Sequence, residues 1–481
     1  MNLLALTRVL GALALFLGGV LLLPLPLSLW DADGAHAGFL GAAAASGVLG
    51  GGLLAATRGT RPELTHREGF AVVTLGWALY GVLGALPFVL SGWIPSFVDA
   101  LFEALSGFTT TGATILTDIE ALPRSLLLWR AATHWLGGMG IIVLSLAILP
   151  MLGVGGMQLF RAEVPGPTAD RLSPRIQDTA KVLWGVYVGL TAAEVALLMA
   201  GGMGAFDAVC HAFATMATGG FSTRNASVAA FGSAYVDGVI TLFMYLAGVN
   251  FALHHAVLAG KAFKAVRSEE LRVYTGIALG ATAVLMVANW GEVYADAFDN
   301  LRYSAFQAVS ILTTTGFGTA DYEGWPIVCQ VLLVLLMFIG GSAGSTGGGM
   351  KVSRVLLIVK HAGVQVWGLI HPRGVRRVKL DGRPVPDGVL QGILGLFALY
   401  LLVTGGGALG MAALGMDPVT SVASVVACVG NIGPGLGEVG PVDNYAHLPQ
   451  AGKALLTFCM LLGRLEIFTV LAVFFPSAWR R

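Results

Sequence analysis

The sequence contains few charged residues and no segment with the composition of a soluble domain. Asp, Glu, Lys and Arg make up only 11% of its 481 residues, whereas soluble proteins carry about 25%. Apolar residues make up 56%, and the mean hydropathy is +0.78. Uncharged apolar runs of about twenty residues recur along the chain, and each is long enough to cross a bilayer. The composition therefore predicts a polytopic membrane protein.

Groups that carry enzyme chemistry are equally scarce. The motif HExxH does not occur, GxSxG is matched only by letter within the glycine-rich run at residues 340–344, and the apolar runs contain no paired carboxylates. Four cysteines lack CxxC or other metal-ligand spacing, which favours small buried residues over metal ligands. These are Cys210, Cys329, Cys428 and Cys459. We therefore expect a protein that is not an enzyme.

Nucleotide and nucleic-acid binding are not expected either. Residues 405–410 fit GxGxxG by letter, but they lie inside an apolar run without a preceding strand, so the glycines indicate close helix packing. The net charge of +1 gives no reason to expect a nucleic-acid partner. We expect no organic cofactor on this chain, and any control by nucleotides would have to come from a partner.

The distribution of charge predicts an orientation in the membrane. Cationic residues gather near residues 58–67, 261–267 and 373–383, which a consistent topology places on one side. The positive-inside rule makes that side cytoplasmic, together with both termini. Many acids fall on the opposite side, among them Glu103 and Asp207, and an acidic outer face could gather cations.

One pattern occurs four times after two leading membrane helices near residues 3–30 and 38–57. Each unit has a long apolar helix, a short amphipathic segment, a Thr/Gly loop and a second long apolar helix. The short segments, of about 11 residues or roughly 16 Å, cannot cross a hydrocarbon core of about 30 Å. Backbone that stops at this depth is tolerated where it is buried in protein or lines water. The four short segments are residues 96–108, 206–216, 300–312 and 418–427.

These units divide the chain into five parts and predict ten spanning helices with four re-entrant ones. The long helices are expected near residues 69–92, 126–152, 179–202, 233–262, 271–295, 326–358, 388–414 and 450–475. The predicted parts are two leading helices in residues 1–67 and pore units in residues 68–178, 179–268, 269–385 and 386–481. We expect an all-α fold in which the four short helices surround one cavity.

A loop rich in Thr and Gly follows each short segment, at residues 110–114, 217–221, 314–318 and 428–432. The third position of every loop is a glycine, namely Gly112, Gly219, Gly316 and Gly430. Aiming successive carbonyls at one axis requires a backbone angle there that glycine adopts easily. Potassium filters are built from four such loops. The predicted ion-binding residues are Thr110, Thr111, Gly112, Thr218, Gly219, Gly220, Thr315, Gly316, Phe317, Val429, Gly430 and Asn431. The hydroxyls of Thr111, Thr218 and Thr315 could cap the inner end of the row of ions.

The loop sequences TTTGAT, ATGGFST, TTTGFGT and GNIGPG resemble the filter loops of the Trk/Ktr/HKT superfamily of potassium transporters. The length and the two leading helices resemble its TrkH branch. The resemblance implies a bacterial-type inner (plasma) membrane protein, with four helix–pore helix–filter loop–helix repeats in fourfold pseudosymmetry around one pore. It also implies bound K⁺ as the transported ion, a homodimer and a cytoplasmic TrkA-like regulatory subunit that binds nucleotides.

The resemblance also bears on selectivity. In plant relatives, serine at the first-loop glycine accompanies sodium permeation, so Gly112 favours potassium. The fourth loop is the most divergent, with Val429 where the other loops carry threonine.

A glycine-rich run at residues 340–351 divides the last helix of the third unit. It nearly spells a phosphate-binding loop, but its lysine comes one residue late and no strand precedes it. A plain cytoplasmic linker would leave too few residues before it to span a bilayer. The resemblance implies an intramembrane loop, residues 340–350, that obstructs the pore and moves on opening. The predicted gating residues are Gly341, Gly344, Gly347, Gly348, Gly349, Lys351 and Arg464.

Arg464 is expected in the middle of the last helix, where a charge should face a cavity or a partner. It could pair with Glu466 or with helix-end carbonyls. The resemblance instead suggests that it contacts the glycine loop as an electrostatic barrier, a role that Lys351 could share. Two further polar residues are expected within helices: His134 as a packed or interfacial residue, and Glu194 as a paired carboxylate or part of a proton route.

Two functions remain open from the residues. The first is gated potassium uptake through a channel-like filter. The alternative is a cation-coupled symporter with alternating access, driven by H⁺ or Na⁺, which binds its substrate between broken helices.

Overall fold

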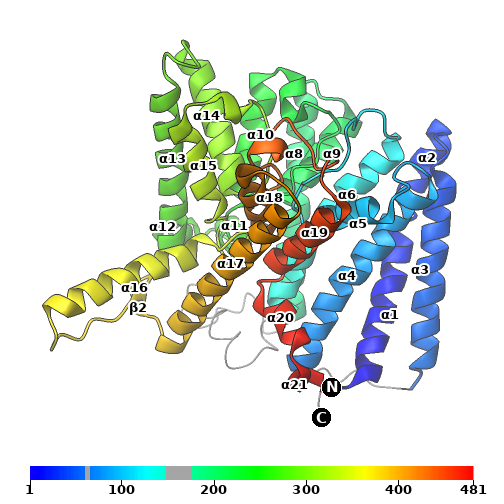
Figure 1. Ribbon diagram of the computed structural model, residues 1–481, viewed down its shortest axis with the longest axis horizontal. Coiled ribbons are helices and arrows are strands. Elements are labelled where there is room, and N and C mark those ends of the chain that lie inside the picture. Colours follow the sequence, from blue (N-terminus) through cyan, green and yellow to red (C-terminus); the bar gives the residue numbers. More distant parts are fainter. Residues whose placement is uncertain (60–65, 148–175, 480–481) are drawn as a thin grey trace.

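The computed structural model describes residues 1–59, 66–147 and 176–479. Apart from one two-residue hairpin, β1 (Lys379–Leu380) with β2 (Arg383–Pro384), the regular structure in these ranges is helical. Figure 1 shows the helices as one bundle, with α16 (Val352–Ile370) and the hairpin projecting from its lower end. The expected helix end near residue 152 and part of the loop at residues 58–67 lie outside the described residues.

The leading part of the chain forms one edge of the bundle (Figure 1). It consists of α1 (Leu3–Val20), α2 (Leu25–Asp31) and α3 (His36–Ala56). Helices α1 and α3 pack closely because small residues face each other: a Cβ on Gly50 would lie 2.7 Å from the carbonyl oxygen of Gly11. The helix expected at residues 3–30 is interrupted by a turn at residues 21–24, between α1 and α2.

In each of the four expected units, a shorter helix follows a long first helix. The first unit has α4 (His66–Leu90), α5 (Phe97–Phe108) and α6 (Arg124–Ala147). The second has α8 (Ile176–Ala200), α9 (Ala205–Met216), α10 (Ala234–Ala247) and α11 (Phe251–Leu258), followed by α12 (Ala262–Arg267). The third has α13 (Glu269–Asn289), α14 (Ala297–Leu312), α15 (Ile327–Met337) and α16. The fourth has α17 (Asp387–Ala413), α18 (Pro418–Gly430), α19 (Gln450–Arg464), α20 (Phe468–Phe474) and α21 (Pro476–Trp479). Three 3₁₀ helices, η2 (Ser227–Phe231), η3 (Tyr322–Gly324) and η4 (Gly437–Val439), lie in the connections after α9, α14 and α18.

Local sequence fixes where three of the short helices begin. The side chains of Ser96, Asp296 and Asp417 accept hydrogen bonds from the first backbone N–H groups of α5, α14 and α18. Such N-caps satisfy donors that have no partner within the helix. Helix α9 begins after Gly204 without a side-chain cap. All four short helices begin within three residues of the expected position.

Two expected helices are broken. The expected helix at residues 233–262 bends by 101° between α10 and α11, and that at residues 450–475 bends by 115° between α19 and α20. At the first break, the Asn250 side chain accepts from Ala252 N and starts a new helix. At the second, Glu466 and Ile467 have positive φ, of 58° and 47°, which an α-helix cannot accommodate.

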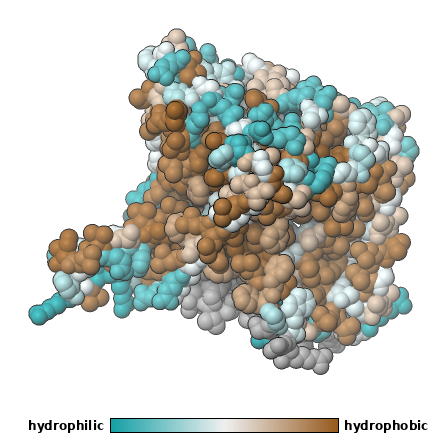
Figure 2. Space-filling view, viewed as in Figure 1, coloured by the Kyte–Doolittle hydropathy of each residue, from teal (hydrophilic) through white to brown (hydrophobic). Residues whose placement is uncertain are grey.

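Six described helices are long and apolar enough to cross a membrane, or eight if each bent pair counts as one span. Ten were expected. The two remaining expected spans include α6 and α15. Helix α6 runs up to undescribed residues, and α15 has only 11 residues. Figure 2 shows hydrophobic side chains across the middle of one face and hydrophilic ones gathered above, as expected for a protein with several membrane spans.

Candidate functional site

The loops after the four short helices share one backbone pattern. In each loop, the first residue with positive φ lies near the helix end; these residues are Thr110, Thr218, Thr314 and Asn431, with φ of 53°, 54°, 61° and 55°. Two positions later, each loop has a glycine with positive φ; these are Gly112, Gly220, Gly316 and Gly433, with φ of 81°, 80°, 79° and 97°. The loops therefore have a common structural register, which does not depend on matching letters in the sequence.

In this backbone register, two of the four glycines differ from those expected from the sequence. The positive φ expected at the third loop position is found at Gly112 and Gly316, but Gly219 and Gly430 do not have it. The second loop carries an extra glycine, so Gly220 takes the position. Helix α18 runs to Gly430, three residues beyond the expected end, so the fourth loop starts later and Gly433 takes the position. Val429 lies in the last turn of α18.

The four glycines place the loops in a closed circle. A Cβ on Gly112 would lie 2.0 Å from the carbonyl oxygen of Gly219. The equivalent distances are 2.0 Å from Gly220 to Thr315 O, 1.9 Å from Gly316 to Ile432 O, and 2.7 Å from Gly433 to Thr111 O. The contacts pass from the first loop to the second, third and fourth, and back to the first. Each glycine thus touches the carbonyl of the residue that precedes the equivalent glycine in the next loop.

The hydroxyls of Thr111 and Thr315, which were expected to cap the row of ions, form hydrogen bonds within the protein. The Oγ1 atoms of Thr111 and Thr109 lie 2.8 Å apart, and Thr315 and Thr313 form the same pair at 2.8 Å. Asn431 Nδ2 also donates to Thr111 Oγ1 at 3.0 Å. The hydroxyls of Thr111 and Thr315 therefore bond toward the ends of their short helices, and Thr110 and Thr314 are the threonines in register with Thr218.

Phe317 contributes its backbone and its ring to different contacts. Its carbonyl accepts from Ser310 Oγ at 2.7 Å, which ties the third loop back to α14. Its ring is buried and stacks on His211 of α9, with centroids 5.7 Å apart. Phe317 therefore joins the third loop to the second short helix.

The glycine segment, residues 340–351, links α15 to α16 and packs against the ends of three short helices. Thr346 Oγ1 donates to Met216 O of α9 at 3.0 Å, and Gly348 N donates to Thr314 Oγ1 at 2.7 Å. A Cβ on Gly348 would lie 2.3 Å from Gly430 O of α18. The segment therefore lies directly against the helix ends from which the loops start.

The backbone of the glycine segment is tightly folded. Gly340, Gly344, Gly349 and Lys351 have positive φ. A Cβ on Gly341 would lie 2.8 Å from Ser345 Oγ, and one on Gly347 would lie 3.0 Å from Thr313 O. At Gly344 the corresponding neighbour is Asn250 Oδ1, at 3.0 Å, and at Gly349 it is the Cα of Gly340, at 2.9 Å. Larger residues at these positions would have to displace the segment or its neighbours.

Arg464 ends α19 beside the break to α20 and binds the glycine segment. Its Nη1 donates to Thr346 O at 2.7 Å, and its Nη2 donates to Gly137 O of α6 at 3.1 Å. The residue is only 3% exposed. The alternative pairing with Glu466 is wrong, because Glu466 binds Arg354 Nη2 at 2.9 Å. Lys351 Nζ also donates within the segment, to Gly347 O.

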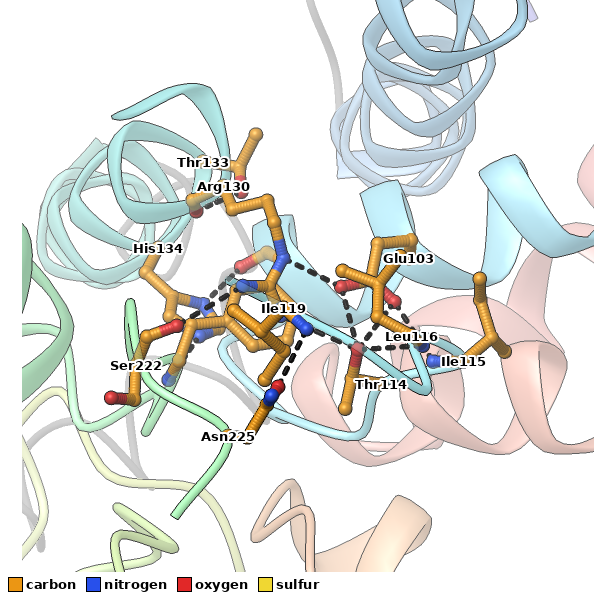
Figure 3. Close-up of polar contacts among 12 residues, drawn as sticks. Glu103, Thr114, Ile115, Leu116, Ile119, Arg130, Thr133, His134, Ser222 and Asn225 are labelled. Atoms are coloured by element: carbon orange, nitrogen blue, oxygen red, sulfur yellow. Dashed lines mark hydrogen bonds and ion pairs between the residues drawn. The ribbon is translucent and has the colours of Figure 1, made fainter. Parts of the chain in front are cut away.

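Polar side chains that sequence reasoning missed lie behind the first two loops (Figure 3). Glu103, expected on the acidic outer side, is buried and pairs with Arg130 of α6, the Nε–Oε1 distance being 2.8 Å. Each short helix carries a polar residue seven positions before the first loop residue with positive φ, a pattern that becomes visible only when the loops are aligned on their backbone. These residues are Glu103, His211, Gln307 and Ser424.

The two polar residues expected within helices are both fully buried. His134 is packed, with Nδ1 2.8 Å from Gly107 O and Nε2 accepting from Phe221 N at 3.2 Å. Glu194 of α8 has no hydrogen-bond partner for either carboxylate oxygen in the described part of the chain, so the expected internal pair is not found.

Comparison with known proteins agrees with this arrangement. The family model described as TrkH, a cation transport protein, matches residues 36–480. The Trk system potassium uptake protein TrkH of Salmonella typhimurium is 44% identical over 481 residues, covering 99% of each chain, and that of Escherichia coli K12 is 43% identical with the same coverage. The crystal structure of the potassium transporter TrkH from Vibrio parahaemolyticus matches with a TM-score of 0.92 at 37% identity, covering 100% of both chains. The chain is therefore a member of the TrkH cation transport family, a membrane transport protein with several spans and not an enzyme.

Proposed function

We propose that the chain takes up potassium through a single pore, in which the four loops form a selectivity filter. The observation that carries this proposal is the closed circle of glycine–carbonyl contacts that begins and ends at the first loop. A circle of four equivalent loops supports fourfold pseudosymmetry of the units in residues 68–178, 179–268, 269–385 and 386–481. The names of the relatives, which are potassium uptake proteins, support potassium as the ion.

The filter would bind a dehydrated ion through backbone oxygen atoms. Carbonyl rings can replace the hydration shell of K⁺. The carbonyls in register around the circle are those of Thr111, Gly219, Thr315 and Ile432, and the neighbouring residues Thr110, Thr218, Thr314 and Asn431 form the next layer. The carboxyl ends of the short helices carry partial negative charge and would favour a cation on the inner side.

The glycine segment would act as the gate. It lies against the inner ends of the second, third and fourth short helices, and two cationic side chains, Arg464 and Lys351, bind its carbonyls. A positive charge below the filter opposes the passage of cations. Opening would require the segment to leave the helix ends, and the backbone freedom of its glycines suits such a change.

We also infer the assembly of the protein with its partners and its orientation in the membrane. The names of the relatives place them in a Trk system, which supports the presence of further components, and we infer from the resemblance of the filter loops a homodimer that works with a cytoplasmic, nucleotide-binding TrkA-like subunit. The cationic loops support cytoplasmic N- and C-termini in a bacterial inner membrane.

The decisive experiment measures ion flux into liposomes that contain the purified protein. We expect K⁺ and Rb⁺ to enter well ahead of Na⁺ and Li⁺, and Gly112→Ser to reduce that preference. Equal entry of all four ions into liposomes with the unaltered protein would contradict the proposal. A steady uptake of K⁺ that collapses when a proton or sodium gradient is removed would favour the coupled symporter instead.

A further inference from the structure

A fully buried ion pair lies behind the first and second filter loops. Arg130 of α6 and Glu103 of α5 have side chains that are 2% and 0% exposed. Removing two charges from water costs several kcal/mol per ion, roughly, and the cost is offset only when every polar atom finds a good partner. The hydrogen-bond partners of Arg130 and Glu103 therefore indicate the role of this ion pair.

Most of these partners lie at the outer ends of the loops, at their last residue or directly after it. Glu103 accepts from Ile115 N at 3.0 Å and from Thr114 Oγ1 at 3.0 Å, just beyond Gly112 in the first loop. Arg130 Nη1 donates to Ser222 O, directly after the second loop, at 3.2 Å, and Nη2 donates to Thr114 Oγ1 at 3.3 Å. One guanidinium thus joins the outer ends of both loops, as Figure 3 shows.

The aromatic ring of Phe221 fixes the second loop to the same helix. The Arg130 guanidinium lies 4.1 Å from the centre of this ring, a cation–π contact. His134 lies one helical turn further along the same face of α6 and stacks on the ring at 4.1 Å. His134 Nδ1 lies 2.8 Å from Gly107 O at the end of α5, and Nε2 accepts from Phe221 N. These two bonds require a neutral imidazole with its proton on Nδ1.

The space behind the second loop leaves little room for movement. A Cβ on Gly219 would lie 2.5 Å from the His134 ring, and one on Gly112 would lie 2.0 Å from Gly219 O. Gly219 is thus held between the His134 ring and the first loop. Any shift of α6 side chains at this point would change the distance between the first and second loops.

Neutral side chains hold the third and fourth loops, and the nearest carboxylate contact, Glu323 Oε1 accepting from Gly437 N at 2.6 Å, is half-buried and lies four residues beyond Gly433. Ser310 Oγ donates to Phe317 O at 2.7 Å, and Gln307 Nε2 donates to Ala320 O at 3.3 Å. The hydroxyl of Tyr445 donates to Gly433 O at 2.7 Å. Charge-assisted hydrogen bonds are about twice as strong as neutral ones. The first and second loops therefore have the stiffer connection.

We propose that Glu103, Arg130 and His134, here called the polar bracket, are positioning residues that set the spacing of the first and second loops. In doing so they determine how strongly the filter prefers K⁺ to Na⁺. This inference rests on the proposed function, because it assumes that the four loops bind the ion. Carbonyl oxygens held at a fixed separation are one way to discriminate between two ions of equal charge, and the polar bracket fixes one side of the circle.

The test replaces Arg130 by lysine, which keeps the charge but cannot make the three separate hydrogen bonds of a guanidinium. We expect Arg130→Lys to lower the ratio of K⁺ to Na⁺ flux into liposomes about tenfold, equivalent to about 1.4 kcal/mol, with total cation flux largely kept. Stabilisation of the folded protein by KCl relative to NaCl, measured as the difference in Tm, should shrink in parallel, because it reports ion binding without transport.

The matched control is Arg302→Lys. Arg302 Nε binds Asp237 Oδ2 at 2.7 Å, a distance close to that of the Arg130 pair. Its other contacts are Asp299 and the ring of Tyr303, none of which belongs to a filter loop. We expect Arg302→Lys to leave the K⁺ to Na⁺ ratio unchanged. A similar loss of preference in both variants would overturn the role of the polar bracket.

The outcomes separate this inference from the proposed function. An unaltered protein without K⁺ preference would contradict the filter itself. A selective unaltered protein with an equally selective Arg130→Lys variant would overturn the polar bracket and leave the filter in place. If Arg130→Lys does not reach the membrane, His134→Gln is measured in its place, with the same two readouts and the same decisive outcomes.

Discussion

The loop circle and the glycine segment lie against each other and are both rich in glycine, yet they are held in different ways. In the loop circle, a glycine of each loop touches the backbone carbonyl of the next loop, and side chains behind the loops fix their outer ends. The glycine segment is tied by backbone hydrogen bonds to the break between α10 and α11, from Ser342 N to Gly248 O and from Phe251 N to Gly344 O, whereas its hydrogen bonds toward the short helices and α19 use side chains, including those of Thr314 and Arg464. Backbone against backbone gives a fixed structure, whereas side-chain donors and acceptors can be exchanged. We infer a rigid filter above a releasable gate.

Gly433→Ala should have the largest effect, because it adds a side chain inside the loop circle. The φ of 97° is strained for alanine, and the added Cβ would meet Thr111 O at 2.7 Å. We expect K⁺ uptake in cells to fall about a hundredfold, equivalent to about 3 kcal/mol.

Gly430→Ala is the matched control for the register. Gly430 lies within α18, and its nearest neighbour would be the end of the flexible Ile432 side chain at 2.8 Å. We expect most of the uptake to remain. If Gly430→Ala reduced K⁺ uptake more than Gly433→Ala, the result would instead support the register expected from the sequence, with Gly430 in the filter.

Arg464→Ala should have the next largest effect, in the opposite direction. It removes a buried charge and two hydrogen bonds, to Thr346 O and Gly137 O. Only the bond to Thr346 O holds the glycine segment, and one charge-assisted hydrogen bond contributes about 1.5–3 kcal/mol, so we expect K⁺ flux without the regulatory subunit to rise at least about tenfold. Flux is measured in liposomes with the purified chain alone.

Arg464→Lys separates the two functions that one guanidinium combines. It keeps the positive charge but loses the two-pronged contact with α6 and the glycine segment. An intermediate rise in flux is expected if both charge and contact matter. Unchanged flux in both variants would remove Arg464 from the gate.

Thr314→Val tests a single contact between the two regions and should have a smaller effect. It removes the hydroxyl that accepts from Gly348 N at 2.7 Å while keeping the shape of the side chain. One hydrogen bond contributes about 1 kcal/mol, so the basal flux should rise about fivefold.

Thr110→Val is the control for this contact. Thr110 occupies the same position in the first loop, but its hydroxyl has no hydrogen-bond partner among the described residues. We expect no rise in basal flux. Equal increases in the two variants would show that the loop, and not its contact with the glycine segment, was altered.

Asp207→Asn, at the outer start of α9, should have the smallest effect. Burial raises the pKa of Asp207, but hydrogen bonds from Thr223 and Arg224 outweigh this effect, so its pKa lies below the ordinary value. The ionised form therefore stabilises the fold above the unfolded pKa of about 3.9 and loses this contribution as pH falls through the folded pKa. We expect Asp207→Asn to lower stability at pH 7 by less than about 1 kcal/mol, since Arg224 is partly exposed.

This last prediction is checked by thermal unfolding across pH. The difference in Tm between the two proteins should begin to shrink as the pH falls below the unfolded pKa of about 3.9, and it should disappear only below the lower pKa of folded Asp207, where both proteins carry a neutral side chain. A difference that grows in acid would contradict the assigned direction of the pKa shift.

The sequence was sufficient to predict the short helices and the places of their loops. Their length and amphipathic character are local properties, and three of them start at a side-chain cap that can be read directly. The register of the second and fourth loops was not predictable in this way. In the second loop, the adjacent Gly219 and Gly220 cannot be told apart by letter. In the fourth loop, the register depends on where α18 ends, and Asn431, whose Nδ2 bonds reach Thr111 and Met460, defines that end through tertiary contacts.

The helix breaks and the polar bracket were missed for the same reason. Nothing local near Glu466 indicates a break, whereas its partner Arg354 lies more than a hundred residues away in the sequence. Glu103 reads as one more acid of the outer face until Arg130 is brought beside it. Long-range pairs of this kind decide whether a charge is buried, and a single sequence does not contain that information.

The position of Arg464 has an electrical consequence. Its two hydrogen bonds end on carbonyl oxygens, which are dipoles, so the guanidinium retains a full positive charge between the halves of a bent helix. If opening displaces this group along the membrane normal, work is done against or with the transmembrane potential, at about 2.3 kcal/mol per elementary charge per 100 mV. The resting voltage of the cell would then bias the open and closed populations in addition to driving the permeant ion.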